Sequence, residues 1–394
     1  MEIVLTIFYF ILFCFIINKI SFFEDNVISK KWFISIFTIK VLTSILLTLI
    51  YTYYYTDRST ADIFKYFDDS KVMFEAIKTR PLDFLRMIFG INNDSLYFNE
   101  TYYDNMRFWY SRHQTNLFTD SHTIIRFNAI VQLFSFGYFN VHNVFINFVS
   151  LIGLTAIFKI AKPYFSQYKK VLFYAIFLAP SVLFWGSGLL KESIIFLGVG
   201  ILLLQLSKPF SLINMGLMVI ALALLTYTKL YIIAALTPAI LGYIFHQTIL
   251  KEKALYSYLL STLIVVGACF LLLNAPLKLN PIQLIIMKQH DFIDLMNQVQ
   301  NSSSFNTDLL QNMTDVILSI PHALSTTFVR PFIWESNSPF MLMSATENIA
   351  FIIFLVISLF YFPRPVEALS LLHFGYFYKI CILTLILFGF MFPS

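Results

Sequence analysis

Two carboxylates and a phenol share one side of a predicted helix near residue 62. Asp62, Tyr66, Asp69 and Met73 follow one another at i, i+4, i+7 and i+11, which places them in one stripe at about 100° per residue. An ionised carboxylate beside an acceptor hydroxyl can act as a general base. We therefore predict Asp62 and Asp69 as candidate catalytic residues and Tyr66 as a candidate substrate-binding residue.

Short strings that carry a cation form a second group of candidates. The cations are Lys191, Lys229 and Arg330, accompanied in their strings by Glu192, Trp334 and Glu335. A phosphate needs such donors because its charge cannot be left bare next to hydrocarbon. The three cations at one depth would resemble a phosphate or pyrophosphate clamp, so we predict all six residues as substrate-binding. The alternative for Lys191 and Glu192 is a structural ion pair.

Metal-ligating residues are sparse in this sequence. The histidines near the predicted outer face have no zinc-ligand spacing, so no zinc site is predicted for His113, His122, His142, His290 and His322. A Mg²⁺ or Mn²⁺ ion held by Asp62 or Asp69 together with substrate oxygens stays open as an alternative.

The helix that carries Asp62 is expected to lie along a membrane surface. A narrow apolar stripe runs through Ile63, Phe67, Ser70, Phe74 and Ile77. Thr60 is a candidate cap at the start of this helix. Arg80-Pro81 ends it, because the residue before a proline avoids the helical region. A second amphipathic segment follows at residues 82–91, and an aromatic, polar stretch at 92–120.

The composition requires a membrane for these elements. Of 394 residues, 58% are hydrophobic and only 12% are charged, whereas a soluble domain carries roughly 25% charged residues. A soluble globular protein is therefore excluded. The formal net charge of +5 does not indicate nucleic acid, since Lys and Arg at loop ends orient membrane proteins. We predict an all-α, polytopic integral membrane protein with a single transmembrane domain, 1–394.

A spanning helix needs about 20 mostly apolar residues, and the segmentation gives about ten spans, at 3–20, 32–55, 141–160, 171–187, 190–206, 211–226, 231–248, 255–273, 348–363 and 376–392. Basic clusters fall on one side throughout, which we assign to the cytoplasm. The long loops 56–140, with its surface helices, and 274–347 are then extracytoplasmic. The segment 124–139, with Arg126 and Asn128, is expected to be re-entrant or interfacial.

Taken in chain order, these motifs resemble a known family. They are the surface helix with Asp62, Tyr66 and Asp69, the second surface helix, Arg126-Phe-Asn128, the Pro180-Ser-x-x-x-Trp string that leads to Lys191-Glu192, and Arg330-Pro-Phe-x-Trp334-Glu335. This pattern resembles the polytopic GT-C superfamily of glycosyltransferases, which take sugars from polyprenyl-phosphate carriers on the outer membrane face. The resemblance covers roughly residues 32–350 and adds Arg126 to the candidate substrate-binding residues.

The resemblance implies an inverting sugar transfer in cell-envelope glycan assembly. Asp62 or Asp69 would deprotonate or orient the acceptor, and Lys191, Lys229 and Arg330 would hold the lipid phosphate that leaves. The implied partners are a polyprenyl-linked sugar donor, membrane lipid and a glycan or protein acceptor, with no nucleic acid. The implied place is the bacterial inner (cytoplasmic) membrane, with the catalytic face extracytoplasmic.

Three other functions stay open. An O-antigen-type polysaccharide polymerase shares the plan of many spans with outer-loop cations. A transporter or flippase needs charges deep in the spans, where Lys40 is the only clear example. A non-catalytic subunit of a membrane envelope complex requires a stable copurifying partner.

Overall fold

The computed structural model describes residues 1–55, 58, 61–109, 121–165, 167–209, 211–251, 253–274, 280–299 and 309–361. Within these ranges the chain forms helices and turns and no strand, as the sequence predicts. Among the described residues, five helices are long and apolar enough to cross a membrane: α1 (Glu2–Lys19), α2 (Lys30–Tyr53), α7 (Phe139–Ala161), α11 (Leu212–Thr248) and α12 (Ala254–Leu271).

The remaining predicted spans differ from long straight helices. The span predicted at 171–187 is divided into α8 (Lys169–Phe177) and α9 (Pro180–Trp185), because Pro180 forces Ala179 into an extended conformation (ψ 126°). The spans predicted at 211–226 and 231–248 both lie in α11, which is interrupted at Lys229 (φ −151°, ψ 88°). The span at 190–206 is α10 (Lys191–Leu206). The span at 376–392 lies outside the described residues.

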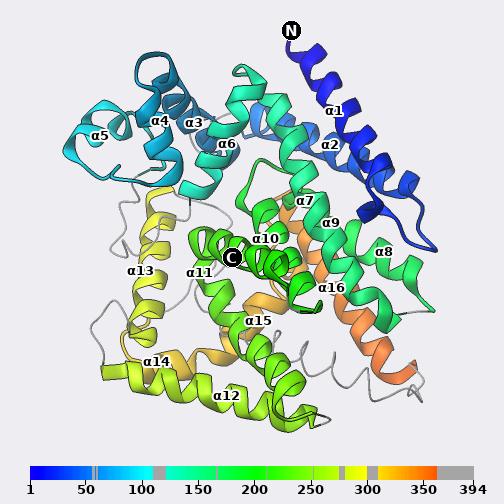
Figure 1. The fold of residues 1–394 in the computed structure, drawn as a ribbon. Helices are drawn as coiled ribbons and strands as arrows, with labels where there is room; N and C mark the ends of the chain where they lie inside the picture. The colour runs from blue at the N-terminus through cyan, green and yellow to red at the C-terminus, as the bar shows by residue number, and fades with distance from the viewer. Residues whose placement is uncertain are drawn as a thin grey trace. The chain divides into compact units, whose positions relative to one another are not determined.

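The chain forms two compact units. Unit 1 comprises Met1–Ser111 and Thr119–Leu230, and unit 2 comprises Arg112–Phe118 and Tyr231–Ser394. In unit 1, α7 packs against α1, α2 and α10 (Figure 1). A Cβ on Gly153 would lie 2.3 Å from the backbone of Phe196, and one on Gly200 would lie 2.3 Å from the Gly153 carbonyl oxygen. Small residues therefore let α7 and α10 approach backbone to backbone.

Aromatic side chains fill the core between α1, α2, α7 and α8. Phe13, Phe33, Phe37, Phe158, Phe173 and Phe177 are among its buried members. Phe33 makes edge contacts with Phe173 and Phe177, at centroid distances of 5.2 and 5.8 Å. The high phenylalanine content is thus used for helix packing in this part of the chain.

Within unit 1, the described part of the first long loop forms four helices. They are α3 (Asp62–Thr79), α4 (Pro81–Phe89), α5 (Leu96–Thr101) and α6 (His122–Ser135), with a short turn, η2, at Tyr103–Asn105. α3, α4 and α6 lie side by side (Figure 1). The predicted start of α3 and its end at Arg80-Pro81 are confirmed. Its N-cap is Ala61, which offers no side-chain hydrogen bond, and Thr60 lies outside the described residues.

In α3, burial extends beyond the predicted apolar stripe. Ile63, Phe67 and Ser70 are buried, as are Tyr66, Asp69 and Met73 on the adjacent stripe. The second stripe therefore does not stand clear of the protein, because α6 and the segment around 102–109 cover the helix from two sides. In α4, Phe84, Met87 and also Asp83 are buried, while the apolar side chains of Leu82, Leu85 and Phe89 are exposed.

Unit 2 includes the described part of the second long loop. It holds α12, α13 (Pro281–Val299), α14 (Met313–Leu318), α15 (Ile320–Phe328), the turn η5 (Ile333–Glu335) and α16 (Pro339–Tyr361). A small core forms from Ile286, Leu310 and Val316. Asn312 caps α14 by accepting the Asp315 amide at 3.0 Å, and the Asp315 carboxylate accepts the Asn312 amide in return.

Candidate functional site

Asp62 lies at the exposed start of α3, close to the start of α10. The Tyr66 hydroxyl donates to Asp62 Oδ2 at 3.4 Å, and the Tyr66 ring is buried. Lys191 Nζ lies 5.5 Å from the centroid of that ring and attracts the Asp62 carboxylate electrostatically. The N-terminal parts of α3 and α10 are far apart in sequence, yet they bring three groups together: the Asp62 carboxylate, the Tyr66 phenol and the Lys191 ammonium.

The neighbouring charges extend this cluster to α11. Lys229 Nζ lies 3.3 Å from Glu192 Oε1, and these side chains are 21% and 34% exposed. The interruption of α11 at Lys229 directs this lysine to the start of α10. A partly exposed ion pair contributes only about 0–1 kcal/mol. A phosphate that approaches Lys229 therefore competes with a weak interaction.

The surroundings of Asp62 favour a basic carboxylate. Although Asp62 is exposed as a residue, partial desolvation by the surrounding protein is the largest influence and raises the pKa of its carboxyl group. Lys191, Lys65 and the Tyr66 hydrogen bond oppose this rise in pKa, and Glu192 adds to it. A raised pKa makes the ionised carboxylate a better proton acceptor, which suits a general base.

Asp69, the second predicted catalytic residue, is engaged differently. Its carboxylate is buried and accepts two backbone amides, Arg107 N–H at 2.9 Å and Phe108 N–H at 2.8 Å. Burial is again the largest influence and raises the pKa of Asp69, and the two amides lower it. Both oxygens thus accept hydrogen bonds that hold the segment after η2 against α3. Of the two carboxylates, Asp62 is the exposed one and Asp69 the buried one.

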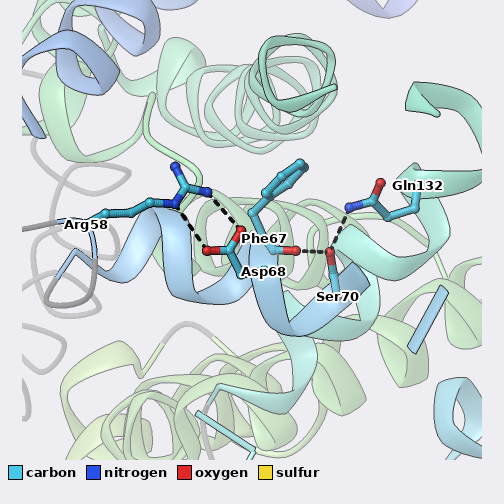
Figure 2. Close-up of polar contacts among 5 residues, drawn as sticks. All are labelled: Arg58, Phe67, Asp68, Ser70 and Gln132. Atoms are coloured by element: carbon cyan, nitrogen blue, oxygen red, sulfur yellow. Dashed lines mark hydrogen bonds and ion pairs between the residues drawn. The ribbon is translucent and has the colours of Figure 1, made fainter. Parts of the chain in front are cut away.

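Two further contacts fix α3 (Figure 2). Arg58 forms a bidentate ion pair with Asp68, in which Nη2 lies 2.8 Å from Oδ1 and Nε lies 3.3 Å from Oδ2. The Arg58 guanidinium also lies 4.1 Å from the Phe64 ring centroid. On another side of the helix, Gln132 of α6 donates to Ser70 Oγ at 3.1 Å. These contacts hold the helix that presents Asp62. The sequence analysis did not single out Arg58 or Gln132.

Arg126 supports the same region from α6. Its Nε donates to the Met87 carbonyl at 2.8 Å near the end of α4, and its guanidinium lies 5.4 Å from the Trp109 ring centroid. Burial lowers the pKa of Arg126. Trp109 is itself stacked between Tyr103 and His122, at 4.4 and 3.7 Å. Arg126 therefore ties α4 to this aromatic stack, a role in positioning.

The predicted residues of the last string lie in unit 2. Arg330 Nη2 is 2.8 Å from Glu335 Oε1, and Glu335 Oε2 accepts the Phe332 amide at 3.0 Å. Trp334 is 79% exposed and its ring is stacked on that of Phe332 at 4.7 Å. Unit 1 holds Lys191 and Lys229, so a clamp that joins them to Arg330 stays a prediction.

A buried polar network links α3, α6 and α7, and sequence reasoning missed it. From Ser70 and Gln132 it continues through Ser135, whose Oγ lies 2.8 Å from His142 Nε2, to Asn128, whose Oδ1 lies 2.9 Å from His142 Nδ1. Asn128, Gln132 and Ser135 recur at i, i+4 and i+7, a spacing that could have revealed the shared face. Each member is completely buried, and Asn128 Nδ2 has no hydrogen-bond partner in the described part of the chain.

No group of three His, Cys, Asp or Glu side chains that could hold a metal ion occurs among the described residues. A divalent cation at Asp62 would thus take most of its ligands from the substrate and water, which is how Mg²⁺ commonly binds. Comparisons with protein-family models, with curated proteins and with solved structures find no match to this chain.

Proposed function

We propose that this protein transfers a sugar from a polyprenyl-linked donor to an extracytoplasmic acceptor at the surface of a bacterial cytoplasmic membrane. One observation carries the proposal: Asp62, Tyr66 and Lys191 converge at the exposed start of α3. In this reaction Asp62 takes the proton of the acceptor hydroxyl as that oxygen forms the new bond to the sugar. Lys191 and Lys229 stabilise the phosphate that leaves with the lipid.

The position of the cluster relative to the apolar helices supports a lipid-linked substrate. α2 ends in a run of tyrosines, of which Tyr53, Tyr54 and Tyr55 are exposed. Lys30, Lys31 and Trp32 mark its other end. Aromatic residues gather at membrane–water interfaces, and Lys and Arg gather on the cytoplasmic side. Asp62 follows the tyrosine end within a few residues, which in this proposal puts it at the depth of a lipid phosphate.

The first experiment identifies the lipid. The protein is purified in nanodiscs, copurifying lipids are determined by mass spectrometry, and binding of a polyprenyl phosphate is titrated. We expect Lys191→Ala to weaken this binding about tenfold, the loss of one charge-assisted contact. Lys78→Ala, an exposed lysine at the end of α3, serves as the matched control and should bind as the wild type does.

The outcome separates the functions that the sequence leaves open. Binding of bulk phospholipid alone, together with a stoichiometric protein partner, would replace the transferase by a non-catalytic subunit. Where a sugar-loaded polyprenyl donor is found, the product decides the reaction. A single added sugar indicates a transferase, and a ladder of repeating units indicates an O-antigen-type polymerase.

A further inference from the structure

Lys40 is a buried cation in the middle of α2. Its side chain is completely inaccessible to solvent, and it forms no ion pair in the described part of the chain. Its Nζ donates to the Gly186 carbonyl at 2.7 Å and lies 3.2 Å from Ser187 Oγ. A buried charge without a carboxylate is costly unless its hydrogen bonds are satisfied.

The atoms that Lys40 binds belong to the break between α9 and α10. Gly186 follows the last residue of α9, where the carbonyl groups of a helix lack internal partners and carry partial negative charge. Ser193 Oγ of α10 donates to the same carbonyl at 3.0 Å. Asn147 of α7 donates its amide to the Ser187 carbonyl at 3.0 Å. Three helices therefore satisfy the polar backbone of one buried, non-helical segment.

This segment is also tightly packed. A Cβ on Gly186 would lie 2.4 Å from the Val182 carbonyl oxygen, and one on Gly188 would lie 2.6 Å from Leu47 Cδ2. Leu189 and Leu190 are buried. The next two residues are Lys191 and Glu192, in the first turn of α10. A displacement of the break would therefore also displace Lys191 and Glu192, which lie near Asp62 and Lys229.

We infer that Lys40 is a positioning residue: its ammonium group holds the α9–α10 break and thereby keeps Lys191 and Glu192 beside Asp62 and Lys229. The inference concerns the site of the proposed function. Of the measurements that test it, only the binding of polyprenyl phosphate rests on that function. Lys40→Met removes the charge but keeps a long side chain, and the Gly186 carbonyl still accepts the hydrogen bond from Ser193 Oγ. A positioning role therefore predicts local loosening without a loss of global stability.

The test compares Lys40→Met, Lys40→Gln and Lys40→Arg in the full chain in nanodiscs. Hydrogen–deuterium exchange of the 186–193 segment is followed by mass spectrometry, with thermal unfolding and polyprenyl phosphate binding measured in parallel. We expect exchange in this segment to rise about tenfold in the Met and Gln variants, the loss of a charged hydrogen bond, and to stay near the wild-type rate in the Arg variant. Lys31→Met, an exposed lysine on the same helix, is the control.

Three results would overturn the inference: unchanged exchange at 186–193 in a folded Lys40→Met protein, an equal rise in exchange along the whole chain, or a rescue by Gln as complete as that by Arg. Should Lys40→Met fail to fold, Ser187→Ala removes one of the two contacts and must raise exchange in the same segment by a smaller factor. If exchange rises locally while wild-type protein binds no polyprenyl phosphate, the proposed function fails and the positioning role stands.

Discussion

The charged cluster around Asp62 and the buried network around His142 are both polar, but they are built in opposite ways. The cluster combines charged side chains at the starts of α3 and α10 with Lys229 at the interruption of α11, and its ion pair Lys229–Glu192 is partly exposed. The network uses short or neutral side chains that are completely buried and bonded in sequence from Ser70 to Asn128. Buried hydrogen-bonded networks specify packing, although Asn128 Nδ2 has no partner in the described part of this one, whereas exposed ion pairs are weak.

The same contrast recurs within α3. Asp62 and Asp69 lie on one stripe of the helix, seven positions apart. Asp62 is exposed and interacts with side chains of α3 and α10, while Asp69 is buried and binds backbone amides. Identical chemistry therefore serves two purposes, and the surroundings of each carboxylate decide which one.

The largest expected effect is on activity at Asp62. Asp62→Asn removes the proton acceptor but keeps the shape of the side chain, so we expect sugar transfer to fall about 1000-fold, in the range of general-base contributions. Thermal unfolding should stay within a few degrees of the wild type. Glu75→Gln, an exposed carboxylate on the same helix, should be fully active. Full activity of Asp62→Asn would remove Asp62 from the mechanism.

The next largest effect is on stability at His142. His142→Ala leaves a cavity and breaks the bonds to Ser135 and Asn128. We expect the free energy of unfolding to fall by about 3 kcal/mol, measured by denaturant titration in detergent. His322→Ala, at an exposed position, is the control. A loss below about 1 kcal/mol would mean that the network does not determine the packing of α6 against α7.

A smaller loss of stability is expected at Asp69. Asp69→Ala leaves the amides of Arg107 and Phe108 without their acceptor, which should lower the free energy of unfolding by about 2 kcal/mol. Asp68→Ala breaks the exposed pair with Arg58 and should cost less than about 1 kcal/mol. Equal losses at the two positions would contradict the distinction between a buried and an exposed carboxylate.

The smallest expected effect is a shift in pH dependence. Lys65 lowers the pKa of Asp62 by electrostatic attraction, so Lys65→Met removes stabilisation of the carboxylate and raises that pKa further. Since the base works in its ionised form, activity should then begin to rise at a higher pH, while the maximal rate at alkaline pH is kept. Lys78→Met should leave the pH–rate profile unchanged. A shift toward lower pH would show that another group titrates.

The helical character of the chain and several element boundaries follow from the sequence by itself. The apolar runs predict α1, α2, α7 and α12, the periodicity after residue 61 predicts α3, and Arg80-Pro81 predicts its end. These features depend on local properties, namely hydrophobic periodicity and the restricted backbone before proline. The types and positions of the residues likewise predict the members of the cluster, Asp62, Tyr66, Lys191, Glu192 and Lys229.

The tertiary structure decided where those residues lie and what they contact. It separated Asp62 from Asp69, which spacing along α3 treats alike, and it placed Arg126 between the Met87 carbonyl and Trp109, while substrate binding by Arg126 stays a prediction. It also gave Lys40 its partners, 146 and 147 residues away in the chain. The physical reason is that burial and hydrogen-bond partners come from segments remote in sequence, and these determine whether a charged side chain holds the fold or faces a substrate.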